Sequence, residues 1–71
     1  MPNIFSSNQI VSVLQKLGFT FISQKGSHGK YKDFKGNVVI IPMNKKEIPE
    51  GTLRSILKQA DINLKQFKDN I

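Results

Sequence analysis

His28 is the single histidine of the chain and the residue best suited to proton-transfer chemistry. An imidazole has an unperturbed pKa of about 6.5, so it can act as a base or as an acid near neutral pH. Lys30 and Lys32 follow at spacings of two and four residues, which puts all three side chains on one face of a strand. Their ammonium groups could hold a phosphate and stabilise charge that develops on phosphorus. Such a set would suit cleavage of RNA without a metal, in which the 2′-hydroxyl attacks the adjacent phosphate.

Basic residues are concentrated around this histidine. The chain carries a net charge of +6, and the segment 25–46 alone holds six lysines against one acid, a balance of +5. These lysines are Lys25, Lys30, Lys32, Lys35, Lys45 and Lys46. Such an excess favours a polyanionic partner such as RNA, and a solvated lysine-rich surface is the alternative that composition leaves open. We expect Lys25, Lys45 and Lys46 to add to the phosphate contacts of Lys30 and Lys32.

A tight turn directly precedes the histidine. Gly26 and Ser27 are typical turn residues, and the amides of such a turn can face an anion. We expect Ser27 to serve RNA binding by shaping this turn rather than to act as a nucleophile.

The composition excludes several other kinds of site. The chain has no cysteine, which rules out disulfides and thiolate metal centres, and one histidine cannot form a histidine cluster. The five carboxylates stand at positions 33, 47, 50, 61 and 69, with no compact pair on one strand or helical turn. We therefore expect neither a metal nor another cofactor.

The length of 71 residues predicts one domain, 1–71. Residues 1–5 lack the basic start and apolar run of a secretory signal. No stretch approaches the roughly 20 apolar residues that span a membrane. We therefore expect a cytoplasmic protein with no membrane partner.

Hydrophobic periodicity predicts an α+β fold in the order α-β-β-β-α. Ser6 and Gln9 have capping-box spacing, the apolar positions 10, 13, 14 and 17 follow a helical repeat, and Gly18 ends that helix. Strands are expected at 19–23, 28 to about 34 and 38–41, with turns at 25–27 and 35–37 and Pro42 ending the third strand. A second helix from residue 49 or 50 repeats the apolar spacing at 53, 56, 57 and 60, and Asn63 caps a short terminal helix. The spacing predicts a three-stranded antiparallel sheet with both helices on one face.

Alternation along the second strand decides what the uncovered face of the sheet displays. Tyr31 is the large apolar body of this strand, so we expect it to face the helices. His28, Lys30 and Lys32 then point to the open face. Phe34 would fall on that face too, so the strand is expected to end or bulge before it.

Several short motifs follow one another in an order and spacing that is informative in a chain of this length. They are Leu17-Gly18-Phe19, Lys25-Gly26-Ser27-His28, Lys30-Tyr31, Ile41-Pro42 and the segment 51–60, which together extend over nearly the whole chain. In this order they resemble the HicA-type toxins, mRNA interferases of the HicA–HicB toxin–antitoxin systems. The resemblance implies a double-stranded-RNA-binding-like fold, metal-independent cleavage of mRNA by a type II toxin, and restraint by a HicB-like antitoxin that covers the site. It also implies that the histidine of the Gly-Ser-His motif, here His28, is catalytic.

Two positions depart from the pattern of that family. Many members have a polar residue or a second histidine directly after the motif, where this chain has Gly29, and many have a histidine just after the third strand, where it has Asn44. Because His28 is the only histidine, one chain cannot form a two-histidine acid–base pair. A lysine, water, or His28 of a second subunit would then perform the other proton transfer.

Two other functions stay open at this point. A basic sheet face can bind RNA without cutting it, which would make the chain a non-catalytic RNA-binding module. The same face could instead pair with an acidic partner protein. We expect the chain to be a monomer alone or a hetero-oligomer with its antitoxin.

Overall fold

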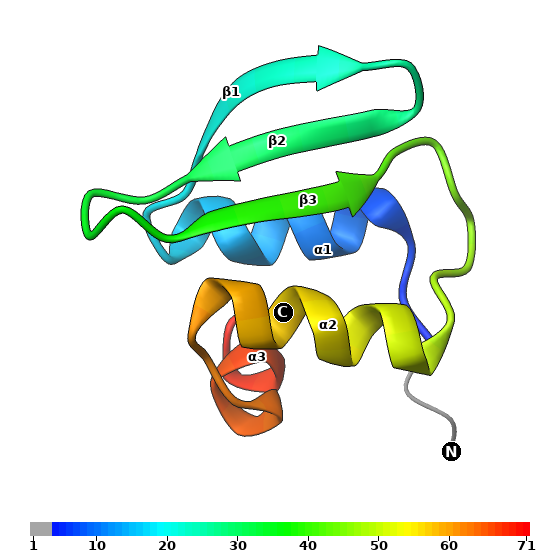
Figure 1. Ribbon diagram of the computed structural model, residues 1–71. Helices are drawn as coiled ribbons and strands as arrows, with labels where there is room; N and C mark the ends of the chain where they lie inside the picture. The colour runs from blue at the N-terminus through cyan, green and yellow to red at the C-terminus, as the bar shows by residue number, and fades with distance from the viewer. Residues whose placement is uncertain (1–3) are drawn as a thin grey trace.

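A computed structural model describes residues 4–71 of the chain. Its elements are α1 (Ser7–Lys16), β1 (Thr20–Lys25), β2 (His28–Lys32), β3 (Val38–Pro42), α2 (Glu50–Ala60) and α3 (Leu64–Asp69), as Figure 1 shows. The predicted order α-β-β-β-α, followed by a short terminal helix, is confirmed. The expectation about the start of the chain rests partly on residues 1–3, which lie outside the described residues.

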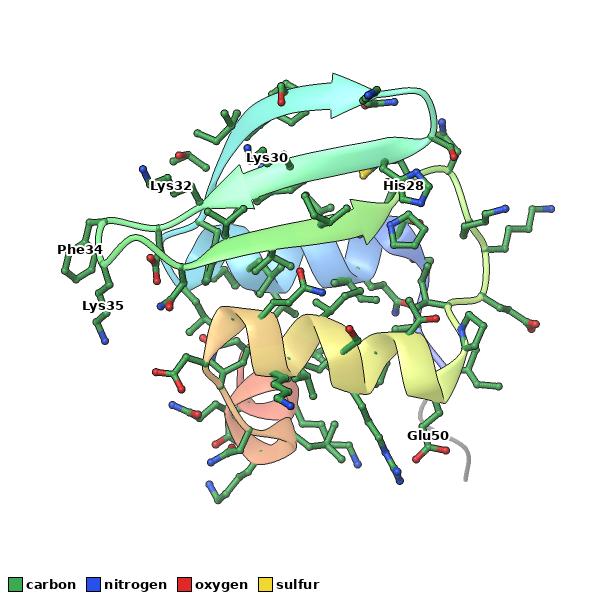
Figure 2. The ribbon with its side chains drawn as sticks, in the orientation of Figure 1. His28, Lys30, Lys32, Phe34, Lys35 and Glu50 are labelled. Atoms are coloured by element: carbon green, nitrogen blue, oxygen red, sulfur yellow. The ribbon has the colours of Figure 1, made fainter. Side chains whose placement is uncertain are left out.

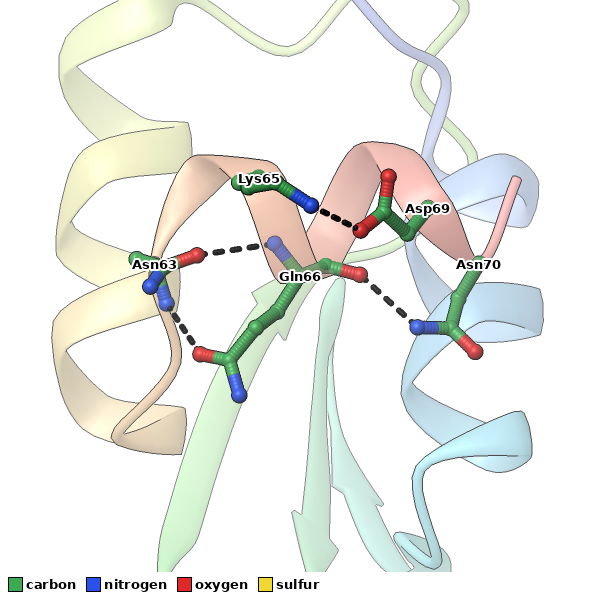
Figure 3. Close-up of polar contacts among 5 residues, drawn as sticks. All are labelled: Asn63, Lys65, Gln66, Asp69 and Asn70. Atoms are coloured by element: carbon green, nitrogen blue, oxygen red, sulfur yellow. Dashed lines mark hydrogen bonds and ion pairs between the residues drawn. The ribbon is translucent and has the colours of Figure 1, made fainter.

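Capping boxes begin two of the helices. At α1 the Ser6 hydroxyl accepts a hydrogen bond from the Gln9 N–H at 3.1 Å, and Gln9 Oε1 accepts one from the Ser6 N–H at 2.8 Å. Asn63 and Gln66 repeat this arrangement at α3 with distances of 2.8 and 2.9 Å (Figure 3). Each box satisfies amides that the first turn of a helix leaves without a partner. The starts predicted at Ser6 and Asn63 are therefore confirmed, and Gly18 with φ +97 follows the end of α1 as expected.

The three strands form an antiparallel sheet in the order β1-β2-β3. The prediction of 19–23 for the first strand is wrong at both ends, because β1 begins at residue 20 and continues to Lys25. The turn that follows needs only Gly26 and Ser27 instead of three residues, since Gly26 adopts the positive φ of a two-residue hairpin turn. The second strand ends at Lys32, so the prediction that it stops before Phe34 is confirmed.

Both long helices lie on one face of the sheet, as predicted (Figure 1). The buried core combines inward residues of the sheet with the apolar faces of the helices. Its members are Ile10, Val13, Leu14, Phe19, Tyr31, Val39, Ile41, Ile48, Leu53, Ile56, Leu57, Ala60 and Phe67. In β2 and β3 buried and more exposed residues alternate, which leaves the other face of the sheet open to solvent.

The two edges of the sheet differ. On β3 the Ile40 N–H donates to Gln59 Oε1 of α2 at 2.9 Å, so the helix satisfies this edge amide. None of the six residues of β1 is buried.

No helix within residues 4–71 has the length and apolar content to cross a membrane.

Ser7 fastens the loop after β3 to the start of α1. The residue is only 1% exposed. Its hydroxyl donates to the Pro42 carbonyl at 2.6 Å and accepts from the Lys45 N–H at 3.0 Å. Its own N–H donates to the Lys45 carbonyl at 2.9 Å. Three hydrogen bonds made by one residue therefore hold residues 42–45 against the start of α1.

Candidate functional site

His28 is the first residue of β2, and its exposed side chain lies at one end of the sheet (Figure 2). Lys25 of β1 lies directly opposite it on one side, and Pro42 of β3 lies opposite it on the other. Opposite residues of an antiparallel pair project from the same face, so Lys25 and His28 are neighbours on the open face. The turn of Gly26 and Ser27 joins the two strands at this point, and its short length is what brings the lysine beside the imidazole.

A second cross-strand row adjoins the first. It consists of Ser23, Lys30 and Ile40, one residue from each strand. Neither Ser23 nor Ile40 was a predicted site residue. Alternation in the third strand could have found Ile40, because its neighbours on both sides are buried. No local signal marks Ser23.

A β-bulge at Ile22 explains why Ser23 was not predicted to lie on the open face. Phe21 lies opposite Tyr31, and the two rings meet edge to face with 5.6 Å between centroids, so Phe21 belongs to the side of the helices. In a regular strand Ser23, two positions further on, would face the same side. The extra residue shifts the register between Phe21 and Ser23, which turns Ser23 and Lys25 to the open face.

A hollow of about 670 Å³ opens over these two rows. Its lining consists of Ser23, Lys25, Gly26, Ser27, His28, Lys30 and Ile40. Four predicted site residues, the histidine, the turn serine and two of the lysines, therefore come together in one place. The volume lies within the range of small-molecule sites, about 300–1,000 Å³.

Three predicted lysines lie outside this hollow. Lys32 projects from the same face at the far end of β2 (Figure 2). Lys45 and Lys46 are exposed in the loop after β3, and that loop leaves the sheet at the end where His28 lies (Figure 1). The basic surface thus extends from the hollow in two directions, along β2 and past the end of β3.

The lysines of the open face form no ion pair with any residue of the described part of the chain. The two ion pairs of residues 4–71 lie on the helices, Arg54 with Glu50 at 3.1 Å and Lys65 with Asp69 at 2.9 Å (Figure 3 shows the second). The ammonium groups near His28 are therefore available to an anionic ligand.

Asp33 is the one acid of the segment 25–46, and it is engaged in the turn between β2 and β3. Burial opposes its ionisation. Hydrogen bonds from the Asn37 side chain and from the backbone N–H groups of Asn37 and Lys35, with the charge of Lys35, outweigh this and hold the pKa of Asp33 below its usual value. Because this carboxylate is satisfied within its own turn, it does not neutralise the lysines of the open face.

Tyr31 takes no part in the open face. It is 3% exposed and lies among the core residues, as predicted. Burial raises the pKa of its hydroxyl, which therefore stays protonated. Within residues 4–71 no three histidine, aspartate or glutamate side chains gather as metal ligands.

Gly29, the position after the histidine, points away from the hollow. A Cβ built there would lie 2.9 Å from the sulfur of Met43 and 3.2 Å from Cε1 of Tyr31, on the covered side of the sheet. Met43 thus fills the space that a side chain at this position would need. A side chain at position 29 would point to the covered side of the sheet, so the presence of glycine here removes no group from the face that holds His28. At the second departure, Asn44 adopts a left-handed backbone with φ +62, which asparagine tolerates better than most residues.

The arrangement brings together the elements of acid–base chemistry on a phosphate. The imidazole of His28 is exposed and is a group that can accept or donate a proton in catalysis. Lys25 lies opposite His28 on β1, and Lys30 lies two residues further along β2. The ammonium groups of both can bind an anion in the hollow. Ile40 adds an apolar surface to the same hollow.

The fold and the site together define an α+β domain of the double-stranded-RNA-binding type with a basic open face. A family model described as the HicA toxin of bacterial toxin–antitoxin systems matches residues 7–62, from the start of α1 to just beyond α2. The chain therefore belongs to the HicA toxin family, and this membership implies an antitoxin partner. Among the curated proteins none matches the chain.

Proposed function

We propose that this toxin is a ribonuclease that cleaves mRNA without a metal, with His28 as its general acid or base. The observation that carries the proposal is the position of the imidazole in the same hollow as Lys25 and Lys30. Family membership supports a toxin, and the hollow supports a phosphate-bearing substrate. With mRNA as substrate the enzyme would work in the cytoplasm.

The proposed reaction needs two proton transfers. A base removes the proton of the 2′-hydroxyl, whose oxygen attacks the phosphorus, and an acid protonates the departing 5′-oxygen. The products are a 2′,3′-cyclic phosphate and a free 5′-hydroxyl. Lys25 and Lys30 stabilise the charge on the phosphoryl oxygens. His28 performs one transfer, and Lys25, water, or His28 of a second subunit performs the other.

The remaining predicted residues have supporting roles. Lys32 binds a phosphate further along β2, and Lys45 and Lys46 contact RNA that passes the end of the sheet. Ser27 shapes the turn that joins Lys25 to His28, and its carbonyl accepts from the Met43 N–H at 2.7 Å. A HicB-like antitoxin would restrain the toxin by covering the open face, where it would meet unpaired lysines.

The test compares wild type with His28→Ala on a single-stranded RNA in excess EDTA. Cleavage by wild type to cyclic-phosphate products and its loss in His28→Ala are expected, while Lys58→Ala on α2 serves as a matched surface control that keeps full activity. Equal cleavage by wild type and His28→Ala would contradict the catalytic role. Tight RNA binding without cleavage by wild type would instead identify a non-catalytic RNA-binding module.

A further inference from the structure

Phe34 is the most exposed large apolar side chain within residues 4–71, at 89%. It lies in the turn between β2 and β3, beyond the end of β2. A phenyl ring that stays in water contributes almost nothing to the stability of the core, since the stabilisation scales with the apolar area removed from water. The fold therefore gives no reason for an aromatic residue at this position.

The turn that carries Phe34 is held rigidly. The carboxylate of Asp33 accepts hydrogen bonds from the Lys35 N–H at 3.1 Å, the Asn37 N–H at 2.8 Å and Asn37 Nδ2 at 3.0 Å. The Asp33 N–H donates to the Asn37 carbonyl at 3.1 Å, and the Gly36 N–H donates to the Asp33 carbonyl at 3.2 Å. Five hydrogen bonds around one aspartate thus fix the backbone that presents the ring. A ligand of Phe34 would meet a surface that needs little ordering.

The surroundings of the ring are positively charged. Lys35 Nζ lies 6.0 Å from the centroid of the Phe34 ring, and Lys32 ends the strand two residues before it. The nearest acid, Asp33, uses its carboxylate inside the turn. A flat aromatic surface among lysines is complementary to a base that carries a phosphate, because the ring can stack and the ammonium groups can bind the anion.

Phe34 also lies in line with the candidate site. Figure 2 shows His28 at one end of β2 and Phe34 beyond the other end, with Lys30 and Lys32 between them. Phe34 lies six positions after His28, a distance of about 20 Å along an extended strand. A single strand of several nucleotides could follow this line, with its phosphates on the lysines.

We propose that the toxin binds an unpaired stretch of RNA along β2 and that one base of it stacks on Phe34. This inference rests on the proposed function and specifies its substrate as single-stranded. In a double helix the bases are stacked on one another and present no free face to the ring. The phosphates of the bound strand lie over Lys30 and Lys32 and lead to His28.

The experiment measures binding in a His28→Ala background, so that no RNA is cut during titration. The probe is an oligoribonucleotide of about a dozen residues with 2-aminopurine at successive positions, and a dinucleotide is the short control. Phe34→Ala is expected to weaken binding of the long probe about 5- to 100-fold and to abolish the fluorescence quenching of one 2-aminopurine. Binding of the dinucleotide is expected not to change.

Two further variants separate stacking from other contacts. Phe34→Trp should bind the long probe at least as well as Phe34, while Phe34→Leu, which is apolar but not flat, should bind like Phe34→Ala. Equal affinity of the protein with Phe34 and of the Phe34→Leu and Phe34→Ala variants for the long probe would overturn the proposal. So would a Phe34→Ala variant that keeps its RNA affinity but loses binding to the antitoxin, since the ring would then be a protein contact. These experiments measure equilibrium binding, so their result does not depend on whether wild type cleaves RNA in EDTA. Likewise, if Phe34 makes no contribution to binding, the proposed cleavage by His28 is not contradicted.

Discussion

Ser23 and Lys30 lie directly opposite each other across the β1–β2 ladder and project together from the face that no helix covers. In a regular ladder continued from Phe21, Ile22 would lie opposite Lys30, and Ser23 takes this place because Ile22 is bulged out of the ladder. The bulge therefore decides the composition of the candidate site, although its own residue lies outside the lining of the hollow.

Deletion of Ile22 should leave the open face intact. Without the bulged residue the ladder becomes regular while Ser23 stays opposite Lys30, so RNA affinity is expected to remain within roughly threefold of wild type. Deletion of Gln24 is the matched control, because it also makes the ladder regular but moves Ile22 into the place opposite Lys30. Binding assays and NMR contacts to Lys30 distinguish the two. Equal losses in both deletions would contradict this role of the bulge.

Lys30 should contribute to the salt dependence of RNA binding. Each phosphate contact on a single strand contributes about 0.7 to the log–log slope of affinity against salt concentration, because counterions are released. Lys30→Gln should reduce the slope by about this amount, whereas Lys58→Gln on the exposed side of α2 should not change it. Titrations at several salt concentrations in a His28→Ala background provide the measurement. An unchanged slope in Lys30→Gln would show that this lysine meets no phosphate.

Ser7→Ala should destabilise the protein by about 1–3 kcal/mol, because it leaves the part-buried Lys45 N–H and Pro42 carbonyl without their side-chain partner. Ser12→Ala is the matched control, since it makes the same change at an exposed position of the same helix. Urea denaturation gives the free energy of unfolding of both variants. If the two values agree, the hydrogen bonds of Ser7 do not fasten the loop.

Asp33 should make stability depend on pH in the acid range. Its pKa is lowered in the folded state, so ionisation favours folding above the unfolded pKa, and this contribution is lost as the pH falls through the folded value. The free energy of unfolding of wild type should therefore decrease from about pH 5 downward, and less steeply in Asp33→Asn. Urea denaturation over this range measures both slopes. Parallel curves would show that the turn does not stabilise the ionised carboxylate.

The helices and the core could be predicted because their signals are local. Ser6 with Gln9 and Asn63 with Gln66 satisfy helix starts within a few residues of sequence. The apolar faces that pack on the sheet repeat at helical spacing. The end of β2 before Phe34 was also predicted, although the reason for that prediction was wrong, because Phe34 is 89% exposed in the turn instead of being withdrawn from solvent.

The sequence alone determined the order of the elements, the covered face that holds Tyr31 and the open face that holds His28, since alternation and periodicity follow from backbone geometry. Only the tertiary structure decided which residues of the neighbouring strands accompany His28. Lys25 and Ser23 reach its face through a two-residue turn and a bulge, and strand register is a pairing between distant segments that no single strand encodes. The same holds for Ser7, whose buried hydroxyl joins α1 to the loop after β3.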